Sequence, residues 1–374
     1  MQEINFKIEG MLLRYNFFVP KLYNLCKKLG FEKGKIIPSR AFCSDENQGY
    51  PIILITKHFG AFPFNHGMVG GIIATDRHGP HAHHGQDCVI IHASHIGYDP
   101  EEKKFGEYRR LQIKHPEETP TCGKILGTIA KYNQEYNFAQ KRIFLQKEGD
   151  NCMISIDNLF LDEKREEGLF LDFDNILEKD EDGEYIMLKI FSTSNVFKAS
   201  KRFVEKLENY KWKEGKGEAI GKNLSAELFY FKRKIEDISE GKAHLESNLL
   251  KFMPQIVTSV FPGLTAAMVN SQQEFNRAYR TIANEKEYKG KKVLFISGVN
   301  IDISPMEGQI FPLTKFLPWA AYFQDSSGKS KILEQTEIVK ELAAESAENI
   351  EQINLEEAIG IAEKHKEIEI KDVR

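Results

Sequence analysis

The chain has 374 residues, of which 41% are hydrophobic, and its 51 basic and 55 acidic residues give a formal net charge of −4. This length predicts one large domain or two ordinary ones, because single hydrophobic cores rarely grow beyond about 250–300 residues. The charge balance offers no broad attraction to nucleic acid or to an anionic membrane surface, so we expect neither as a partner.

The compartment is predicted from the N-terminus and the cysteines. The first residues, MQEINFKIEG, carry acidic groups and no apolar run as long as that of a signal peptide. No later segment comes near a run of about 18 apolar residues, the length that a membrane-spanning helix needs. Five widely spaced cysteines favour reduced thiols or metal ligands over a disulfide framework: Cys26, Cys43, Cys88, Cys122 and Cys152. We therefore expect a soluble, cytoplasmic protein.

The first hundred residues predict a helix and a strand on either side of an ambiguous segment. Residues 9–30 are helical by the recurrence of apolar side chains, and Gly30 is the expected end. The apolar run of "PIILITKHFG" (51–60) fits either a buried strand or the core face of a short helix. "CVIIHASHIG" (88–97) is a strand by its β-branched content, with its histidines at or beyond its C-terminal end, where ligands of open α/β sheets collect.

The middle of the chain changes character twice. "GKILGTIAKYNQEY" predicts a helix that begins just after Cys122, where the positive end of the helix dipole favours a thiolate. Residues 141–215 alternate short apolar runs with acidic turns and predict an insert of mixed, mainly extended structure. Residues 224–288 are mostly helical.

The last third begins with the clearest late strand, "KKVLFISGVNIDI" (291–303). From about residue 329 the composition turns to Glu, Lys, Ala and Ile, which predicts one or two amphipathic helices in an appendage or an oligomer contact. The expected organisation is an α/β domain over 1–328 that contains the insert, followed by a charged helical tail over 329–374.

Nine of the eleven histidines lie in the segment from His58 to His115, a higher density than an even distribution along the chain would give. His81, His83 and His84 form "HAHH" between Gly-Pro and Gly, on a predicted loop. Their spacing is not that of the helical H-E-x-x-H motif, so we interpret them as loop residues, or as residues that support other ligands, rather than as a complete metal set.

Thiolates offer a second metal set. Cys43 in "AFCSDEN", His95 in "HASHIG" and Cys122 in "TPTCGK" supply two cysteines and one histidine, a combination that binds catalytic zinc and leaves a fourth position for water. Zinc lowers the pKa of that water from about 15.7 toward about 7. The alternatives are that the cysteines are buried hydrophobes and that Asp45 is only a helix cap.

Four short pieces occur in order along residues 40–130: "CSDE", "FNHGMVGGI", "HASHIGYD" and "TPTCG". Together they resemble the low-CO₂-inducible protein B/C (LCIB/LCIC-like) family, which is related to β-class carbonic anhydrases. "VLFISGVNIDI" resembles that family's late core strand, whereas the 141–215 insert and the tail after 329 have no counterpart that we can place.

The resemblance implies a β-carbonic-anhydrase-like central sheet flanked by helices, with Zn²⁺ bound by Cys43, His95 and Cys122. It also implies reversible hydration of CO₂ to bicarbonate, with Asp45 orienting the water and a homodimer or higher homo-oligomer as the assembly. The glycines of "FNHGMVGGI" would shape a narrow apolar pocket, although they also fit a simple flexible turn. A histidine of the 78–84 loop would carry protons to buffer.

His92 is the near alternative to His95 as a ligand. On a strand, their separation of three residues sends the two side chains to opposite faces. We choose His95 because it stands in "SHIG", the piece that carries the resemblance.

The chain departs from the family pattern at one position. The β-class pattern is Cys-x-Asp-x-Arg, but here Asn47 stands where the arginine is expected, and no arginine lies between Arg40 and Arg77. We take Arg40 as the candidate catalytic partner of Asp45. If neither arginine reaches Asp45, the aspartate could bind zinc itself and close the site.

Three functional hypotheses follow. The first is a zinc-dependent carbonic-anhydrase-like lyase, and the second is a catalytically silent, metal-stabilised binding or scaffold protein in inorganic-carbon handling. The third is a metallohydrolase that uses the loop histidines with Asp76 or Asp87. Substitution of Cys43 separates the third hypothesis from the other two.

Overall fold

The structure is a computed structural model that describes residues 7–74, 86–109, 118–215, 217–235, 241–306, 308–309 and 311–364. The chain divides into two compact units. One unit comprises Met1–Thr119 together with Ser271–Arg374, and the other comprises Pro120–Asn270. The division differs from the predicted one, because it separates the middle of the chain and leaves the C-terminal tail with the N-terminal residues.

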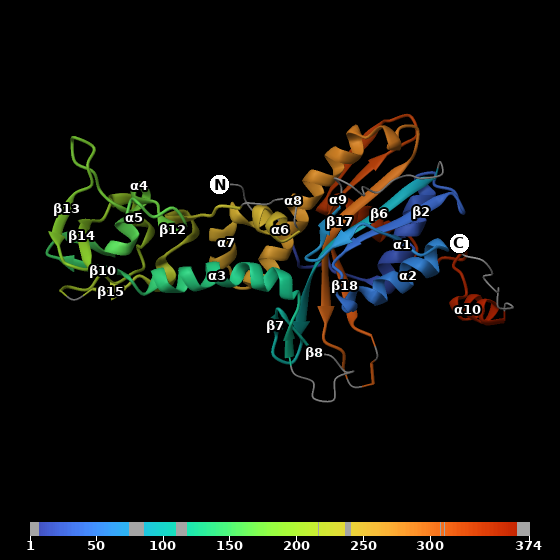
Figure 1. Cartoon of the computed structure of the whole chain (residues 1–374), viewed down its shortest axis with the longest axis horizontal. Coiled ribbons are helices and arrows are strands. Elements are labelled where there is room, and N and C mark those ends of the chain that lie inside the picture. Colours follow the sequence, from blue (N-terminus) through green and yellow to red (C-terminus); the bar gives the residue numbers. More distant parts are fainter. Residues whose placement is uncertain are drawn as a thin grey trace, which may run out of the picture. The chain divides into compact units, whose positions relative to one another are not determined.

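The first unit contains an eight-stranded mixed sheet (Figure 1). The strand order is β1-β18-β17-β6-β2-β3, with β19 beside β18 and β7 beside β6. The strands are β1 (Leu13–Arg14), β2 (Ile36–Phe42), β3 (Phe64–Asn65), β6 (Asp87–Asp99), β7 (Lys104–Phe105), β17 (Val293–Ile303), β18 (Leu313–Gln324) and β19 (Ser330–Glu334).

The centre of this sheet is parallel. β6 pairs with β2 on one side and with β17 on the other, in parallel, and β18 pairs antiparallel with β17. Strands that are buried on both faces need continuous apolar runs, which is why the runs beginning at Cys88 and Val293 form the sheet centre. Both predicted strands are confirmed, but β6 continues to Asp99, so His92 and His95 lie inside it rather than at or beyond its end.

Helices cover both faces of the sheet. α1 (Tyr15–Lys28), α2 (Gly49–Phe59) and α9 (Gln335–Ala344) pack on one face in a cluster that includes Val89 and Ile91 of β6. α8 (Pro262–Asn284) packs on the other face, against Cys88 and Ile90. Alternate side chains of β6 therefore point to opposite faces, as strand geometry requires. This arrangement confirms the predicted α/β fold class.

Two sequence-based expectations are settled in this unit. The ambiguous 51–60 segment belongs to helix α2, which ends at Gly60 with a left-handed φ of 75°. The tail after 329 is not an appendage throughout, because β19 pairs with β18 and α9 buries Ile338 and Leu342 in the core. α10 (Leu355–Lys364) buries none of its side chains.

Small two-stranded sheets complete the first unit near the sheet centre. β4 (Gly67–Met68) pairs with β5 (Ile72–Ile73), and β8 (Glu107–Arg109) pairs with β9 (Glu118–Pro120). The β4–β5 hairpin contains the glycine-rich segment that the sequence analysis singled out.

The second unit contains α3 (Gly123–Gln140), which begins directly after Cys122 as predicted. Its five-stranded sheet has the order β13-β14-β11-β10-β15. These strands are β10 (Ile143–Glu148), β11 (Asn151–Asp157), β13 (Met187–Ile190), β14 (Ser194–Lys198) and β15 (Glu218–Ala219). The prediction of mixed, mainly extended structure over 141–215 is confirmed.

The remaining elements of the second unit are mostly short. β12 (Gly168–Leu171) pairs with β16 (Phe229–Lys232), and α6 (Gly241–Leu250) and α7 (Met253–Thr258) pack on α3. The short helices are α4 (Phe173–Ile176), α5 (Lys201–Lys206) and the 3₁₀ turns η3 (Asn158–Leu161), η4 (Gly221–Asn223) and η5 (Ala226–Leu228). The first unit holds the 3₁₀ turns η1 (Glu46–Gln48) and η6 (Lys286–Tyr288).

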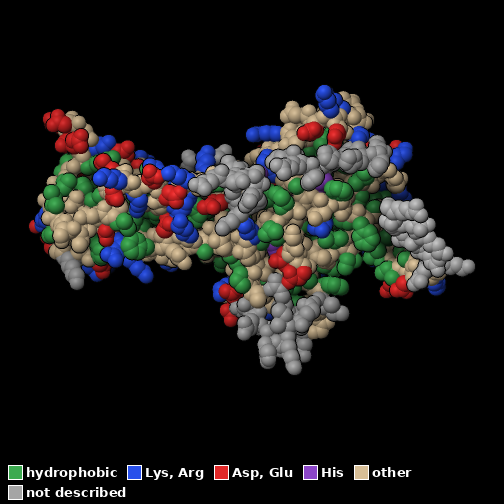
Figure 2. Space-filling model, viewed as in Figure 1, with side chains coloured by type: hydrophobic (Ala, Val, Ile, Leu, Met, Phe, Trp, Pro, Cys, Tyr) green, Lys and Arg blue, Asp and Glu red, His purple; other side chains and the backbone are tan. Residues whose placement is uncertain are grey.

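The surface carries charges of both signs. On the face shown in Figure 2, basic and acidic side chains are interspersed over the described part of the chain and do not gather into one large basic area. No helix among the described residues is long and apolar enough to cross a membrane.

Candidate metal centre

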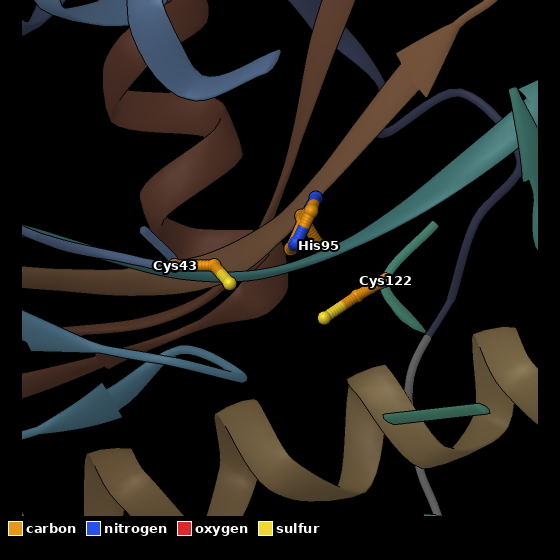
Figure 3. Close-up of side chains that lie close together, drawn as sticks. All are labelled: Cys43, His95 and Cys122. Carbon is orange, nitrogen blue, oxygen red and sulfur yellow. The ribbon is translucent and has the colours of Figure 1, made fainter. Parts of the chain in front are cut away.

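Cys43, His95 and Cys122 come together as a buried group (Figure 3). Cys43 directly follows β2, His95 lies in β6, and Cys122 is the residue before α3. One ligand atom from each residue lies within 4.8 Å of the others. Tetrahedral zinc, with Zn–S of about 2.3 Å and Zn–N of about 2.0–2.1 Å, holds its ligands roughly 3.3–3.8 Å apart, so small side-chain shifts would complete such a site.

The imidazole of His95 is oriented by a buried carboxylate. His95 Nδ1 lies 2.8 Å from Asp302 Oδ2, and neither side chain is exposed. Donation of the Nδ1 proton to Asp302 leaves the lone pair of Nε2 as the metal-binding donor, as in the carboxylate–histidine–zinc arrangement. Burial raises the pKa of the Asp302 carboxyl, and the hydrogen bonds from His95 and Thr314 oppose this rise.

Asp302 is in turn held by a chain of buried hydrogen bonds. Gln48 Nε2 donates to Asp302 Oδ2 over 2.8 Å, and Asn300 Nδ2 donates to Gln48 Oε1 over 2.6 Å. Tyr15 donates its hydroxyl proton to Asn300 Oδ1 over 2.7 Å, and Thr314 donates to Asp302 Oδ1 over 3.1 Å. This chain links α1, the turn before α2 and β17, so the orientation of His95 depends on the packing of the first unit.

These supporting residues were not predicted. The sequence contains one signal for them, the pair of polar residues Asn300 and Asp302 inside the apolar "VLFISGVNIDI". Polar groups two residues apart on a buried strand point to the same face and need partners there. Gln48 and Tyr15 carried no such signal, because their roles depend on contacts with distant residues.

The glycine-rich hairpin approaches Cys43 closely. The backbone N–H of Gly70 donates to Cys43 Sγ over 3.2 Å. A Cβ at Gly67 would stand 1.8 Å from the carbonyl oxygen of Phe42, so only glycine allows the hairpin to lie this near β2. The segment is therefore a close backbone contact with a donor for sulfur, rather than only a flexible turn.

His92 also binds this hairpin, on the face of the sheet opposite to His95. Its Nε2 lies 2.8 Å from the carbonyl oxygen of Gly71, and its Nδ1 lies 2.7 Å from the hydroxyl of Ser297. From α8, the buried Glu274 accepts the backbone N–H of Ile73 over 2.7 Å. His92 and His95 thus point to opposite faces as predicted, and His92 is not among the three grouped ligands.

Replacement of Gly71 by alanine should destabilise the first unit by about 1–3 kcal/mol. Gly71 has φ of +73°, and a Cβ there would lie 2.8 Å from the Cα of Ser94. Urea unfolding would measure the change. Gly49→Ala is the matched control, because a Cβ at Gly49 meets nothing within 4 Å. Equal stability of the two variants would contradict the close packing of this hairpin.

Acid should destabilise the fold through two buried histidines. Burial lowers the pKa of His58 and of His92 from 6.5 to about 4. Between pH 6.5 and about pH 4, the two histidines bind protons in the unfolded chain but not in the folded chain. Their contribution to the free energy of unfolding is therefore fully present above about pH 6.5 and is lost as the pH falls toward 4. From pH 7 to pH 5 we expect a loss of about 2 kcal/mol per histidine in the free energy of unfolding.

Chemical denaturation at both pH values would measure this loss, with His58→Asn as the comparison. Asn349 Nδ2 lies 3.2 Å from His58 Nδ1, and an asparagine at position 58 can keep an acceptor there without titrating. This variant should lose about 2 kcal/mol less than the native chain. An unchanged loss would contradict the assignment.

Asp45 lies at the edge of the metal group. Its Oδ1 accepts the backbone N–H of Asn47 over 3.2 Å, so Asp45 caps η1. Its Oδ2 lies 3.9 Å from His95 Nε2, so the same carboxylate also faces the ligand atoms. Burial raises the pKa of the Asp45 carboxyl, and the adjacent His95 opposes this rise.

The predicted pairing of Arg40 with Asp45 is not formed. Arg40 lies in β2 and is half-buried, and its guanidinium makes no ion pair with any carboxylate of the described ranges. Burial alone lowers its pKa. Arg77, the other arginine considered, lies outside the described residues.

The other predicted site residues divide into two groups. Asp87 bonds with Lys292, accepting its backbone N–H over 2.8 Å. His81, His83, His84 and Asp76, together with the rest of the 78–84 loop, lie outside the described residues. Cys26, Cys88 and Cys152 are thiols away from the metal group, and burial raises the pKa of Cys88 to about 12.

No family model and no curated protein matches the sequence. Among solved structures, that of PtLCIB4, a homolog of the limiting CO₂-inducible protein LCIB, matches with a TM-score of 0.52 and 11% identity, covering 86% of this chain and 95% of that chain. A histidine-to-alanine mutant of PtLCIB4 matches with a TM-score of 0.50 and 12% identity, over 86% and 93% of the two chains. LCIB itself gives a TM-score of 0.46 at 10% identity, over 87% and 96%.

The match with PtLCIB4 establishes the class of fold. The chain is an α/β protein with an LCIB-like fold, which confirms at the level of structure the resemblance found in the sequence. Within that fold it carries a buried Cys–His–Cys group that could hold a metal ion.

Proposed function

We propose that this chain is a zinc-dependent, carbonic-anhydrase-like lyase of the LCIB family that reversibly hydrates CO₂ to bicarbonate. The observation that carries the proposal is the convergence of Cys43, His95 and Cys122, with the imidazole held by Asp302. The LCIB-like fold supports it, since PtLCIB4 is described as a homolog of the limiting CO₂-inducible protein LCIB.

The donor set fits zinc. Two thiolates and one imidazole are soft and borderline ligands that favour zinc over magnesium or calcium, which prefer oxygen. Cys43, His95 and Cys122 would hold the zinc, which would supply a Lewis acid able to lower the pKa of a water molecule toward about 7. All three residues are buried, which keeps bulk solvent and the ions dissolved in it away from the site.

The protein's own groups then have distinct roles. Asp302 fixes the His95 tautomer, and the Gly70 N–H stabilises negative charge on the Cys43 sulfur. Asp45 is anchored through Oδ1, so its Oδ2 can accept a proton from water beside His95 and orient that water toward CO₂. We assign proton transfer to buffer to a histidine of the 78–84 loop.

A second candidate keeps the metal but not the reaction. Asp45 Oδ2 is already 3.9 Å from His95 Nε2, and Arg40 does not restrain it. A modest shift would make this carboxylate a fourth ligand and exclude water. The protein would then be a metal-stabilised binding or scaffold protein.

One preparation tests both candidates. Zinc content and stopped-flow CO₂ hydration would be measured on the same zinc-loaded protein. About one zinc per chain with hydration proportional to protein concentration supports the lyase. One zinc without hydration supports the closed site, and absence of zinc binding refutes both.

The proposed substrates are CO₂ and bicarbonate, with neither nucleic acid nor membrane as a partner. Assembly as a cytoplasmic homodimer or higher homo-oligomer stays a prediction. Sedimentation equilibrium of the full chain would measure the subunit number.

A further inference from the structure

The second unit contains a cavity that the proposed lyase function does not use. It has a volume of 410 Å³ and lies among α3, η3 and the start of β12. Apolar side chains dominate its lining: Phe138, Leu159, Phe160 and Leu169. Phe138 and Leu159 are 40% and 45% exposed, so these two side chains would lose contact with water if a ligand filled the cavity.

Two oppositely charged side chains also line this cavity. They are Arg165 and Glu135. Arg165 Nε and Glu135 Oε2 are both buried, and neither has a hydrogen-bond partner within the described chain. A buried polar atom without a partner costs about 1–3 kcal/mol, so a ligand that satisfies both atoms would recover that free energy.

The rest of each side chain is firmly held. The Arg165 guanidinium lies 4.3 Å from the ring centroid of Phe170 and donates to the carbonyl oxygen of Leu169. Glu135 Oε1 accepts from Arg233, whose side chain is only 5% exposed. These contacts hold the other atoms of the two charged groups, while the Glu135 side chain as a whole stays 27% exposed.

A glycine keeps the space beside them open. Gly168 has φ of +123°, and a Cβ built there would lie 3.6 Å from Arg165 Nε and 3.7 Å from Glu135 Oε2. One small region of the cavity wall thus adjoins both a guanidinium donor and a carboxylate acceptor. The third charged residue of the lining, Glu167, already accepts the backbone N–H of Lys234 over 2.9 Å.

We propose that this cavity binds a small zwitterion with an apolar side chain, the chemical class of an apolar α-amino acid. The carboxylate of the ligand accepts from Arg165 Nε, and its ammonium group donates to Glu135 Oε2. Its side chain lies among Phe138, Leu159, Phe160 and Leu169. A simple anion would leave Glu135 unsatisfied, and a simple cation would leave Arg165 unsatisfied.

Isothermal titration of the full chain with L-leucine and L-phenylalanine tests this site. We expect saturable binding of at least one of them with a Kd of about 1 mM or lower, well within the ligand efficiency of small molecules. For whichever amino acid binds, the N-acetyl derivative, which lacks the ammonium group, and the amide, which lacks the carboxylate, should each bind at least about tenfold more weakly. These analogue comparisons need no variant.

Two variants then locate the site. Arg165→Gln and Glu135→Gln should each weaken binding about tenfold or more, whereas Lys164→Gln, at the exposed neighbouring position, should leave it unchanged. Absence of saturable binding of both amino acids at about 10 mM would overturn the proposal. So would equal affinity for the amino acid and both analogues, or affinity unaffected by both substitutions in folded protein.

Discussion

Replacement of Cys43 by serine is expected to abolish stoichiometric zinc binding. A serine hydroxyl stays protonated near neutral pH, so the site would lose one of its two thiolates and the sulfur that accepts from Gly70. Loss of an outer partner alone costs about 10–100-fold in metal affinity, so loss of a ligand should cost at least about 100-fold. Zinc per chain and competition with a chromophoric chelator would measure this, and CO₂ hydration should fall to the buffer rate.

Cys152→Ser provides the matched control. Cys152 is a free cysteine on β11, outside the three-residue metal group. It should keep about one zinc per chain, which would show that the loss in Cys43→Ser does not follow from removing any thiol. Retention of zinc by Cys43→Ser would contradict the proposed site and direct attention to the histidines at 81, 83 and 84.

The second large effect is expected from Asp302→Asn. The substitution preserves shape but removes the negative charge that accepts the Nδ1 proton of His95 and the amide of Gln48. Metal affinity should fall about 10–100-fold, because the imidazole becomes both less basic and less firmly oriented. Chelator competition would measure the affinity, and thermal unfolding would confirm that the variant is folded.

Thr314→Val separates charge from packing in this test. Thr314 donates to Oδ1, the oxygen of Asp302 that does not contact His95. Loss of the Thr314 hydroxyl should weaken metal binding by less than tenfold, since the His95–Asp302 hydrogen bond remains. Unchanged affinity in Asp302→Asn would show that His95 is oriented without this carboxylate.

The local patterns that proved predictive share a physical basis. Continuous β-branched runs marked the two central strands, and the start of α3 after Cys122 followed from apolar periodicity. Strand alternation predicted that His92 and His95 face opposite sides of the sheet, because they lie three residues apart, whereas the choice of His95 as the ligand came from its place in "SHIG". The structure places them so, with His92 on Gly71 and His95 on Asp302.

Other features of the fold could not be predicted from local sequence patterns. The apolar run at 52–55 fits a buried strand and the core face of a helix equally well. It is helical in the structure, where it packs with α1. The charged composition after 329 suggested a separate tail, yet β19 and α9 belong to the core of the first unit. Likewise, proximity in sequence made Arg40 a candidate partner of Asp45, but its side chain forms no ion pair within the described chain.

The sequence by itself identified the three residues that the structure brings together, the opposite orientations of His92 and His95 on their strand, and the helix that begins after Cys122. Only the tertiary structure decided what surrounds them. The parallel register pairs Phe42 with Ala93, and therefore brings the end of β2 to the middle of β6. The register of β17 pairs Asn300 with His95, so the chain of Asn300, Gln48 and Asp302 meets the imidazole. Such partners are distant in sequence, and their meeting depends on strand register and packing, which no local pattern encodes.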